Sequence, residues 1–153
     1  MKKLLLLVFA ALLLVGCGSD KQKTTTTVCT IDKPYIAYTS AKQTIISEGD
    51  IAKKVSFEGI IVAPSKEELD EAIPLFDAGL KSINSLDGVT AKYERIDEVT
   101  IKDIAEYDLE KTSIDTLSQI GLMQTTTDSK VKVISVEQTT NLLTSNGFTC
   151  KAE

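Results

Sequence analysis

The chain begins with a short apolar segment that cannot be part of its folded domain. Two lysines follow Met1, and every residue from Leu4 to Val15 is apolar. A basic start followed by an apolar run of this length is typical of a secretory signal peptide. A transmembrane helix needs ~20 apolar residues, so an uncleaved signal anchor is the weaker alternative. We therefore predict that residues 1–16 are a signal peptide, which leaves 137 residues for the mature chain.

The segment ends in Leu14-Val15-Gly16-Cys17, the pattern of a bacterial lipobox. Small Gly16 presents Cys17 for transfer of a diacylglyceryl group and for cleavage, which makes Cys17 the predicted lipidation site. Stable attachment takes more than one acyl chain, such as palmitate, and a lipidated Cys17 carries two or three. The expected location is the extracytoplasmic side of a bacterial cell membrane. The rest of residues 17–27, GSDKQKTTTT, has no large apolar side chain and predicts a flexible tether.

Composition excludes several functional classes for the mature chain. Without the two signal lysines, 15 basic residues stand against 22 acidic ones, a net charge of −7. A negative surface repels nucleic acid and anionic lipid headgroups, so we expect no nucleic-acid partner and attachment to the membrane through the lipid. The chain has no histidine and no tryptophan. It therefore lacks the commonest general base and the commonest transition-metal ligand. Aromatic side chains on which sugars or bases could stack are also scarce.

Two cysteines remain once Cys17 is assigned to the lipid. Cys29 and Cys150 lie near the two ends of the predicted domain, residues 28–153. An extracytoplasmic location is oxidising, so this pair predicts a disulfide between the first and last segments, with two separate thiols as the alternative. Closing so long a loop contributes roughly 4–5 kcal/mol on the chain-entropy model.

The first part of the domain has the composition and period of β-strands. Residues 28–31 and 35–46 are rich in β-branched or aromatic side chains. Residues 55–62 alternate between a mostly apolar face and a mixed face. With a turn at Glu48-Gly49-Asp50, an antiparallel meander is the simplest arrangement.

The period changes to that of a helix after residue 64. Ser65-Lys66-Glu67-Glu68 is a capping-box pattern, in which Ser65 accepts a hydrogen bond from the first turn and Glu68 reaches back. An apolar stripe at spacings of three and four then runs from residue 69 to residue 83. Pro74 lacks an N–H and crowds the preceding turn, so we expect it to kink or divide this helix.

Strand periodicity returns at residue 89, and short helices follow. The remaining predicted elements are strands at 89–96 and 99–109, helices at 113–120 and 135–146, and a terminal strand or extended tail at 148–150. Each short helix opens with a capping serine, Ser113 or Ser135, and a polar loop at 124–130 separates the two. This order predicts a single small α+β domain with an antiparallel β-sheet packed against helices.

Acidic residues are dense between 97 and 115, which invites a calcium or carboxylate site. Their spacing matches no EF-hand loop, and alternation places Glu106 and Asp108 on a solvated strand face, so we predict no metal site. Asp103 differs, because alternation places it among apolar residues. It lies at a strand edge, pairs with a lysine or marks a site, or else the register inferred from the alternation is wrong at this point.

Motifs that carry catalytic chemistry are missing. The sequence contains no nucleophile elbow, no Ser-x-x-Lys catalytic context and no glycine-rich phosphate loop. We therefore predict no catalytic residues, no cofactor and a chain that is not an enzyme. The four tyrosines, Tyr35, Tyr38, Tyr93 and Tyr107, are placed on strands, where they either line a groove or pack half-buried.

Several strings of the sequence have a familiar order. They are EELDEAIPLFDAGLKSINSLDGV, YERIDEVTIKDIAEYDLEKTSIDTLSQIGL and ISVEQTTNLLTSNGF. Together with the lipobox they resemble the YehR-like family of small bacterial lipoproteins, over most of residues 55–148. The resemblance implies an α+β fold. The family has no established biochemical function, so the resemblance supplies no site residues. Cys29 and Cys150 are not part of the resemblance and are a feature of this chain.

Three hypotheses about function follow. The first is a non-enzymatic, surface-anchored domain that binds an envelope protein or component through its sheet face or a helix-lined groove. The second is a small-solute or peptide receptor associated with a transporter, which requires a ligand-sized pocket with convergent polar groups. The third is an envelope hydrolase, which requires two carboxylates facing each other across a cleft.

Overall fold

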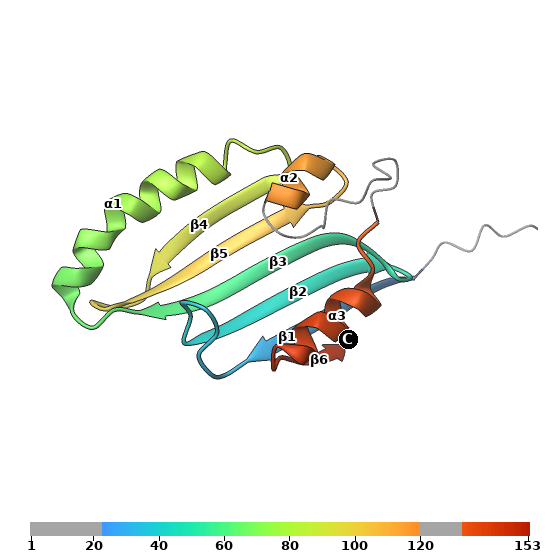
Figure 1. Cartoon of the computed structure of the whole chain (residues 1–153), viewed down its shortest axis with the longest axis horizontal. Helices are drawn as coiled ribbons and strands as arrows, with labels where there is room; N and C mark the ends of the chain where they lie inside the picture. Colours follow the sequence, from blue (N-terminus) through green and yellow to red (C-terminus); the bar gives the residue numbers. More distant parts are fainter. Residues whose placement is uncertain (1–22, 120–132) are drawn as a thin grey trace, which may run out of the picture.

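A computed structural model describes residues 23–119 and 133–153. The elements within these residues are β1 Thr24–Ile31, β2 Ser40–Glu48, β3 Ile51–Val62, α1 Lys66–Ile83, β4 Val89–Arg95, β5 Thr100–Asp108, α2 Ile114–Gln119, α3 Val136–Ser145 and β6 Thr149–Ala152. The strands form one sheet in the order β4-β5-β3-β2-β1-β6, with every neighbouring pair antiparallel (Figure 1). The predicted α+β class is confirmed.

Several predicted segments lie outside the described residues. They are the signal segment 1–16, Cys17 with the tether up to residue 22, and the polar loop at 124–130. No helix in the described part of the chain is both long enough and apolar enough to cross a membrane.

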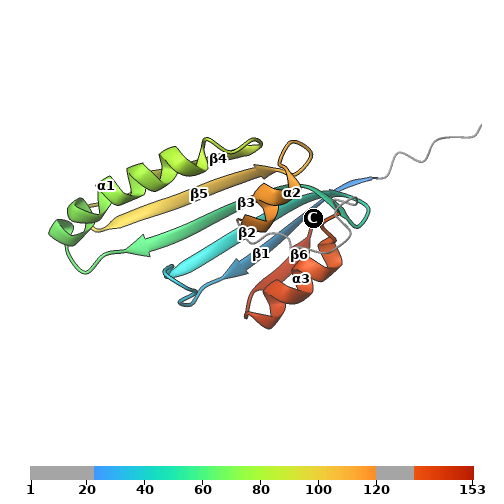
Figure 2. The same ribbon diagram turned by 45° about the horizontal axis from the view of Figure 1, so that its top comes forward.

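The connections explain how the helices come to lie on the sheet. β1, β2 and β3 form the predicted antiparallel meander. The chain then crosses through α1 to β4, and β5 returns between β3 and β4. β6 pairs with β1 at the opposite edge. As a result α1 lies along β4 at one edge of the sheet, and α3 lies beside β1 and β6 at the other (Figures 1 and 2).

One face of the sheet carries the hydrophobic core, because strand side chains alternate between the two faces. The core cluster joins strand residues to α2, α3 and the segments that flank them. Its members are Cys29, Ile31, Ala41, Ile45, Ala52, Val55, Leu109, Leu117, Ile134, Leu143 and Phe148. The other face, which we call the polar face, is mostly polar, and on it Glu58 lies between Lys42 and Lys102, at 2.5 and 3.2 Å. The two faces therefore differ as the alternation predicts.

A carboxylate in the β2–β3 turn positions α3. Ser135 caps this helix by accepting from the Gln138 N–H at 3.1 Å, and its own hydroxyl donates to Asp50 Oδ2 at 2.6 Å. The Glu137 N–H donates to Asp50 Oδ1 at 2.8 Å. These hydrogen bonds, that of Ser135 first, lower the pKa of Asp50. A charged Asp50 thus satisfies N–H groups that the start of a helix leaves unpaired.

Three local predictions were wrong. β1 begins at Thr24, inside the predicted tether, because threonines 24–27 pair with β2 and β-branched residues suit a strand. β2 begins at Ser40, since residues 35–38 form a tight turn instead of continuing the strand. Of the two outcomes predicted for Pro74, the division of the helix was wrong, because α1 continues through this residue to Ile83.

The disulfide between Cys29 and Cys150 is confirmed. The two residues lie directly opposite each other on β1 and β6, with their Cα atoms 4.0 Å apart. The bond closes a loop across a sequence separation of 121. It fixes the last strand of the domain to the first.

Replacing both cysteines by serine should destabilise the domain without changing its fold. The oxidised parent should exceed the double variant Cys29→Ser/Cys150→Ser in free energy of unfolding by about 2–5 kcal/mol, because the open chain gains conformational freedom. Urea denaturation followed by circular dichroism measures this difference. The parent with dithiothreitol should match the variant, and equal urea midpoints for the oxidised parent and the variant would contradict the role given to the disulfide.

Candidate functional site

Small residues face one another between α1 and the sheet. Gly79 lies on α1, and Ala91 and Ala105 lie directly opposite each other on β4 and β5. A Cβ added to Gly79 would meet no atom within 4 Å beyond its chain neighbours and the backbone of its own helix. With no large side chain from either side to fill the space, a cavity of about 500 Å³ is left beneath the helix.

The lining of this cavity, which we call the α1 groove, is apolar and aromatic. Ala72, Leu75, Leu80 and Ile83 contribute from α1. The aromatic residues of the lining are Tyr38, Phe57, Phe76, Tyr93 and Tyr107, which are five of the eight aromatic residues in the chain. Most of the few aromatic side chains are therefore gathered around one cavity.

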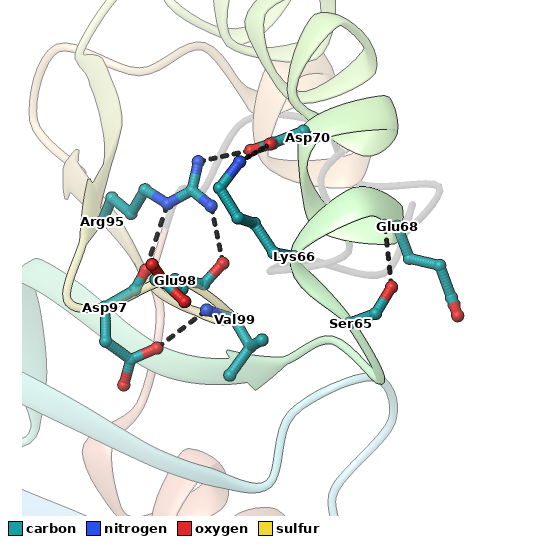
Figure 3. A network of polar contacts seen from close by, with 8 residues as sticks. All are labelled: Ser65, Lys66, Glu68, Asp70, Arg95, Asp97, Glu98 and Val99. Atoms are coloured by element: carbon teal, nitrogen blue, oxygen red, sulfur yellow. Dashed lines mark hydrogen bonds and ion pairs between the residues drawn. The ribbon is translucent and has the colours of Figure 1, made fainter.

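A cluster of polar contacts fixes the first turns of α1. The Arg95 guanidinium donates to Asp70 Oδ1 of α1 at 2.6 Å and to the carbonyl oxygens of Asp97 and Glu98 at 3.0 and 2.6 Å (Figure 3). Lys66 also binds Asp70, and the two cations, Lys66 first, lower the pKa of that carboxyl. The start of α1 is thereby joined to the turn between β4 and β5.

Two further contacts hold α1 along β4. The Tyr93 hydroxyl donates to Asp77 Oδ1 at 3.1 Å, which raises the pKa of this phenol. The Asn84 side chain donates to the Ala91 carbonyl at 2.8 Å and accepts from the Ala91 N–H at 2.6 Å. Leu69 is the buried residue of α1, whereas Leu75 is 76% exposed. The helix is therefore held at the sheet edge by polar contacts, and its apolar stripe is only partly packed.

Asp103 lies in the lining of the α1 groove. It is in the middle of β5, between Gly59 of β3 and Tyr93 of β4, on the helix-covered face. Its Oδ2 accepts a hydrogen bond from the Tyr38 hydroxyl at 2.7 Å. No lysine or arginine nitrogen of the described residues comes within 4.0 Å of this carboxylate. Of the predictions for Asp103, the strand edge and the lysine partner were wrong, and the carboxylate among apolar residues was correct.

A tight turn brings Tyr38 to Asp103. Tyr35 and Tyr38 exchange backbone hydrogen bonds of 2.8 and 2.9 Å, and Ile36 between them has a φ of 55° and is 84% exposed. This left-handed conformation costs a β-branched residue roughly 1–2 kcal/mol. The Tyr38 ring then covers Gly59, where an added Cβ would lie 2.2 Å from the Tyr38 Cδ1 atom. Glycine at position 59 is therefore required for Tyr38 to reach Asp103.

The same turn separates the two tyrosines that sequence patterns placed on one strand. The Tyr35 ring packs edge-on against Phe148 of the core, with ring centroids 4.9 Å apart. The Tyr38 ring packs against Phe57 at 5.0 Å. Tyr38, Tyr93 and Tyr107 line the α1 groove, and Tyr35 does not. Of the two predicted roles, the groove therefore applies to three of the four tyrosines.

Burial and the nearby carboxylate disfavour ionisation of two of these phenols. Burial raises the pKa of Tyr38, and the hydrogen bond and negative charge of Asp103 raise it further. Burial also raises the pKa of Tyr107, with a smaller contribution from the charge of Asp103. Both phenols are therefore neutral near pH 7, which leaves Asp103 as the one acidic side chain of the lining.

The substitution Asp103→Asn tests this arrangement directly. It should lower the pKa of the Tyr38 phenol toward its ordinary value of 10.0, with burial keeping the pKa above that value. Nuclear magnetic resonance titration of tyrosine Cζ signals measures the change. Tyr93, whose partner is Asp77, is the internal control and should keep its raised pKa. An unchanged Tyr38 titration would show that the two side chains are not hydrogen-bonded.

Three of the other acidic residues between 97 and 115 have local partners. Asp97 accepts from the Val99 N–H at 2.9 Å, Asp108 pairs with Lys111, and Glu110 pairs with Lys53. Across residues 23–119 and 133–153, acidic and cysteine side chains form no group of three or more able to hold a metal ion. A second hollow of about 600 Å³ lies mainly on the polar face, but lysine and carboxylate side chains of opposite charge line it together.

Sequence reasoning missed the residues that create the cavity. Gly79 lies within the predicted helix, and Ala91 and Ala105 lie within predicted strands, but no sequence pattern gives any of them a role in a site. The available signal was Gly79, a glycine directly beside the apolar stripe of a helix that continues past it to Ile83. Its significance depends on which strand residues lie below it, and that is set by the β4–β5 register.

Comparisons with known proteins identify the fold. No protein-family model matches the chain, and no curated protein matches it. An NMR structure of a protein from Streptococcus pneumoniae TIGR4 is 13% identical, with a TM-score of 0.61 over 99% of each chain. The NMR structure of E. coli YehR is 24% identical, with a TM-score of 0.59 over 84% of this chain and 91% of that one. These likenesses show a shared fold, as the resemblance to the YehR-like family implied.

Proposed function

We propose that this protein is a lipid-anchored, extracytoplasmic binding protein of a bacterial cell membrane and that its domain holds a small, mostly apolar ligand in the α1 groove. The observation that carries the proposal is the cavity itself. Its volume of about 500 Å³ falls within the ~300–1,000 Å³ typical of small-molecule sites. Its lining combines apolar walls with one polar pair, Tyr38 and Asp103, as such sites do.

The groove favours a small ligand over the other functional hypotheses. A small ligand is favoured over a protein partner because most of the aromatic side chains, together with apolar ones of α1, gather around one hollow of ligand size, although Leu75 at its rim is 76% exposed. A carboxylate hydrolase would require a second acid facing Asp103, and within the described residues its hydrogen-bond partner is Tyr38. We therefore propose a non-enzymatic role. Association with a transporter remains a prediction from the sequence.

The anchor would keep the domain close to the bilayer. β1 begins at Thr24, seven residues after Cys17. Seven extended residues span at most about 25 Å. A lipidated Cys17 would therefore hold the first strand within that distance of the membrane surface, where apolar ligands are concentrated.

Filling the groove from Gly79 tests the binding proposal. The neutral fluorescent probe N-phenyl-1-naphthylamine should bind the parent and bind Gly79→Leu at least tenfold more weakly, because the leucine side chain occupies the cavity. Gly79→Ala is the matched control and should bind within about twofold of the parent. Both variants should be more stable, by roughly 0.5–1 kcal/mol, since glycine is a poor helix former. Equal binding to the parent and Gly79→Leu would refute the groove as the site.

Replacing Cys17 tests the anchor independently. In cells fed an alkyne-bearing palmitate analogue, the parent should acquire the label and fractionate with membranes. Cys17→Ala should lose the label, because the acceptor thiol is absent, and should keep the apolar segment Leu4–Val15, because cleavage also requires Cys17. Cys29→Ser/Cys150→Ser should still be labelled and serves as the control for general loss of cysteine. Labelling of Cys17→Ala would contradict the assignment.

A further inference from the structure

Asp103 is an uncompensated charge in an apolar cavity. The carboxylate is half-buried, and its Oδ2 is bound by Tyr38. No donor from the described residues reaches Oδ1. The lining contains neither lysine nor arginine. The carboxylate is therefore open to a cation that enters the groove, and no cation of the described residues competes for it.

Aromatic rings surround the same carboxylate. Tyr93 is its direct neighbour across the β4–β5 pair, and the Tyr38 ring covers its neighbour on the other side, Gly59. Tyr107 lies four residues after Asp103 on β5 and on the same face of the sheet. Phe57 of β3 lies opposite Ala105, the residue of that face between Asp103 and Tyr107. Aromatic faces attract cations, and desolvated sites strengthen this attraction. Rings and carboxylate therefore select for the same charge.

We infer that the ligand of the α1 groove is an organic cation, an ammonium group joined to an apolar body, with the ammonium against Asp103 and the apolar body along α1. This inference rests on the proposed function of the groove. Charge complementarity carries it, because the single formal charge in the lining is negative and lacks a protein cation. The same charge repels carboxylate amphiphiles of equal length and gives a neutral alcohol no ion pair.

Three probes with one alkyl chain separate these possibilities: octyltrimethylammonium, 1-octanol and octanoate. Binding is measured by displacement of N-phenyl-1-naphthylamine from the predicted mature chain, residues 17–153, carrying Cys17→Ala, which has neither the apolar segment Leu4–Val15 nor the predicted acylation site. The cation should bind roughly tenfold more tightly than the alcohol, and octanoate should bind most weakly. Gly79→Leu should weaken the binding of all three probes.

Asp103→Asn should bring the affinity for the cation to within about twofold of the affinity for the alcohol, with both affinities measured on the same variant. Glu106→Gln is the matched control, because it removes one carboxylate from the same strand on the opposite, exposed face. It should preserve the preference for the cation. The ranking of the three probes on the unsubstituted groove is a test that does not depend on Asp103→Asn folding.

The outcomes distinguish the inference from the proposal on which it rests. If the alcohol or octanoate binds as tightly as the cation, the inference is wrong and the groove remains a binding site for apolar ligands. If Glu106→Gln abolishes the preference as Asp103→Asn does, the selectivity comes from net charge and the inference is again wrong. If the naphthylamine probe does not bind the parent at all, the proposed function fails, and the inference fails with it.

Discussion

The attachment of α1 to the edge strand β4 determines the shape of the helix-covered face. Arg95, Tyr93 and the backbone of Ala91 supply the contacts, at alternate positions along one strand. Because these contacts are polar and lie at the sheet edge, they fix the position of the helix without drawing its apolar stripe onto the neighbouring strands. The space over β5 then depends on residue size, and Ala91 and Ala105 leave it unfilled.

The two halves of the helix-covered face differ in how closely their side chains pack. Under α2 and α3 the core residues interlock, and the Cys29–Cys150 bond reinforces the strands beneath them. Under α1 the aromatic side chains remain half-buried around a cavity. A protein interior is normally packed to the density of an organic crystal, so a cavity of this size sacrifices contact energy. The dense half stabilises the domain and allows the other half to remain open.

Local sequence patterns predicted most of the fold. The alternation of apolar and polar residues identified the covered faces of β3 and β5, and capping serines located the starts of α1 and α3. The even number of remaining cysteines and the predicted oxidising location predicted the disulfide. Thr24 and Tyr35 were misassigned for a shared reason. Threonines read equally well as a polar tether or an edge strand, and no local pattern indicates a left-handed Ile36. Pairing between distant segments decides both cases.

The candidate site was harder to predict, because it depends on relations between elements. Alternation placed Asp103 on the apolar face correctly but gave no partner for it. Its partner Tyr38 comes from a turn 65 residues earlier in the chain and depends on Gly59 of a third segment. The cavity exists because side-chain atoms are missing at Gly79, Ala91 and Ala105. That these three small residues lie around the same space is visible only when the helix is placed on the sheet. Such sites follow from register and topology more than from motif.

The Asn84 side chain has a second consequence, which concerns neighbouring molecules. By bonding both backbone groups of Ala91 on the outer side of β4, it occupies positions where the strand of another chain would pair. At the other edge, β6 offers only the four residues Thr149–Ala152. The sheet is thus closed to extension at one edge and short at the other. Molecules crowded side by side on a surface would meet through side chains, and their sheets would not merge.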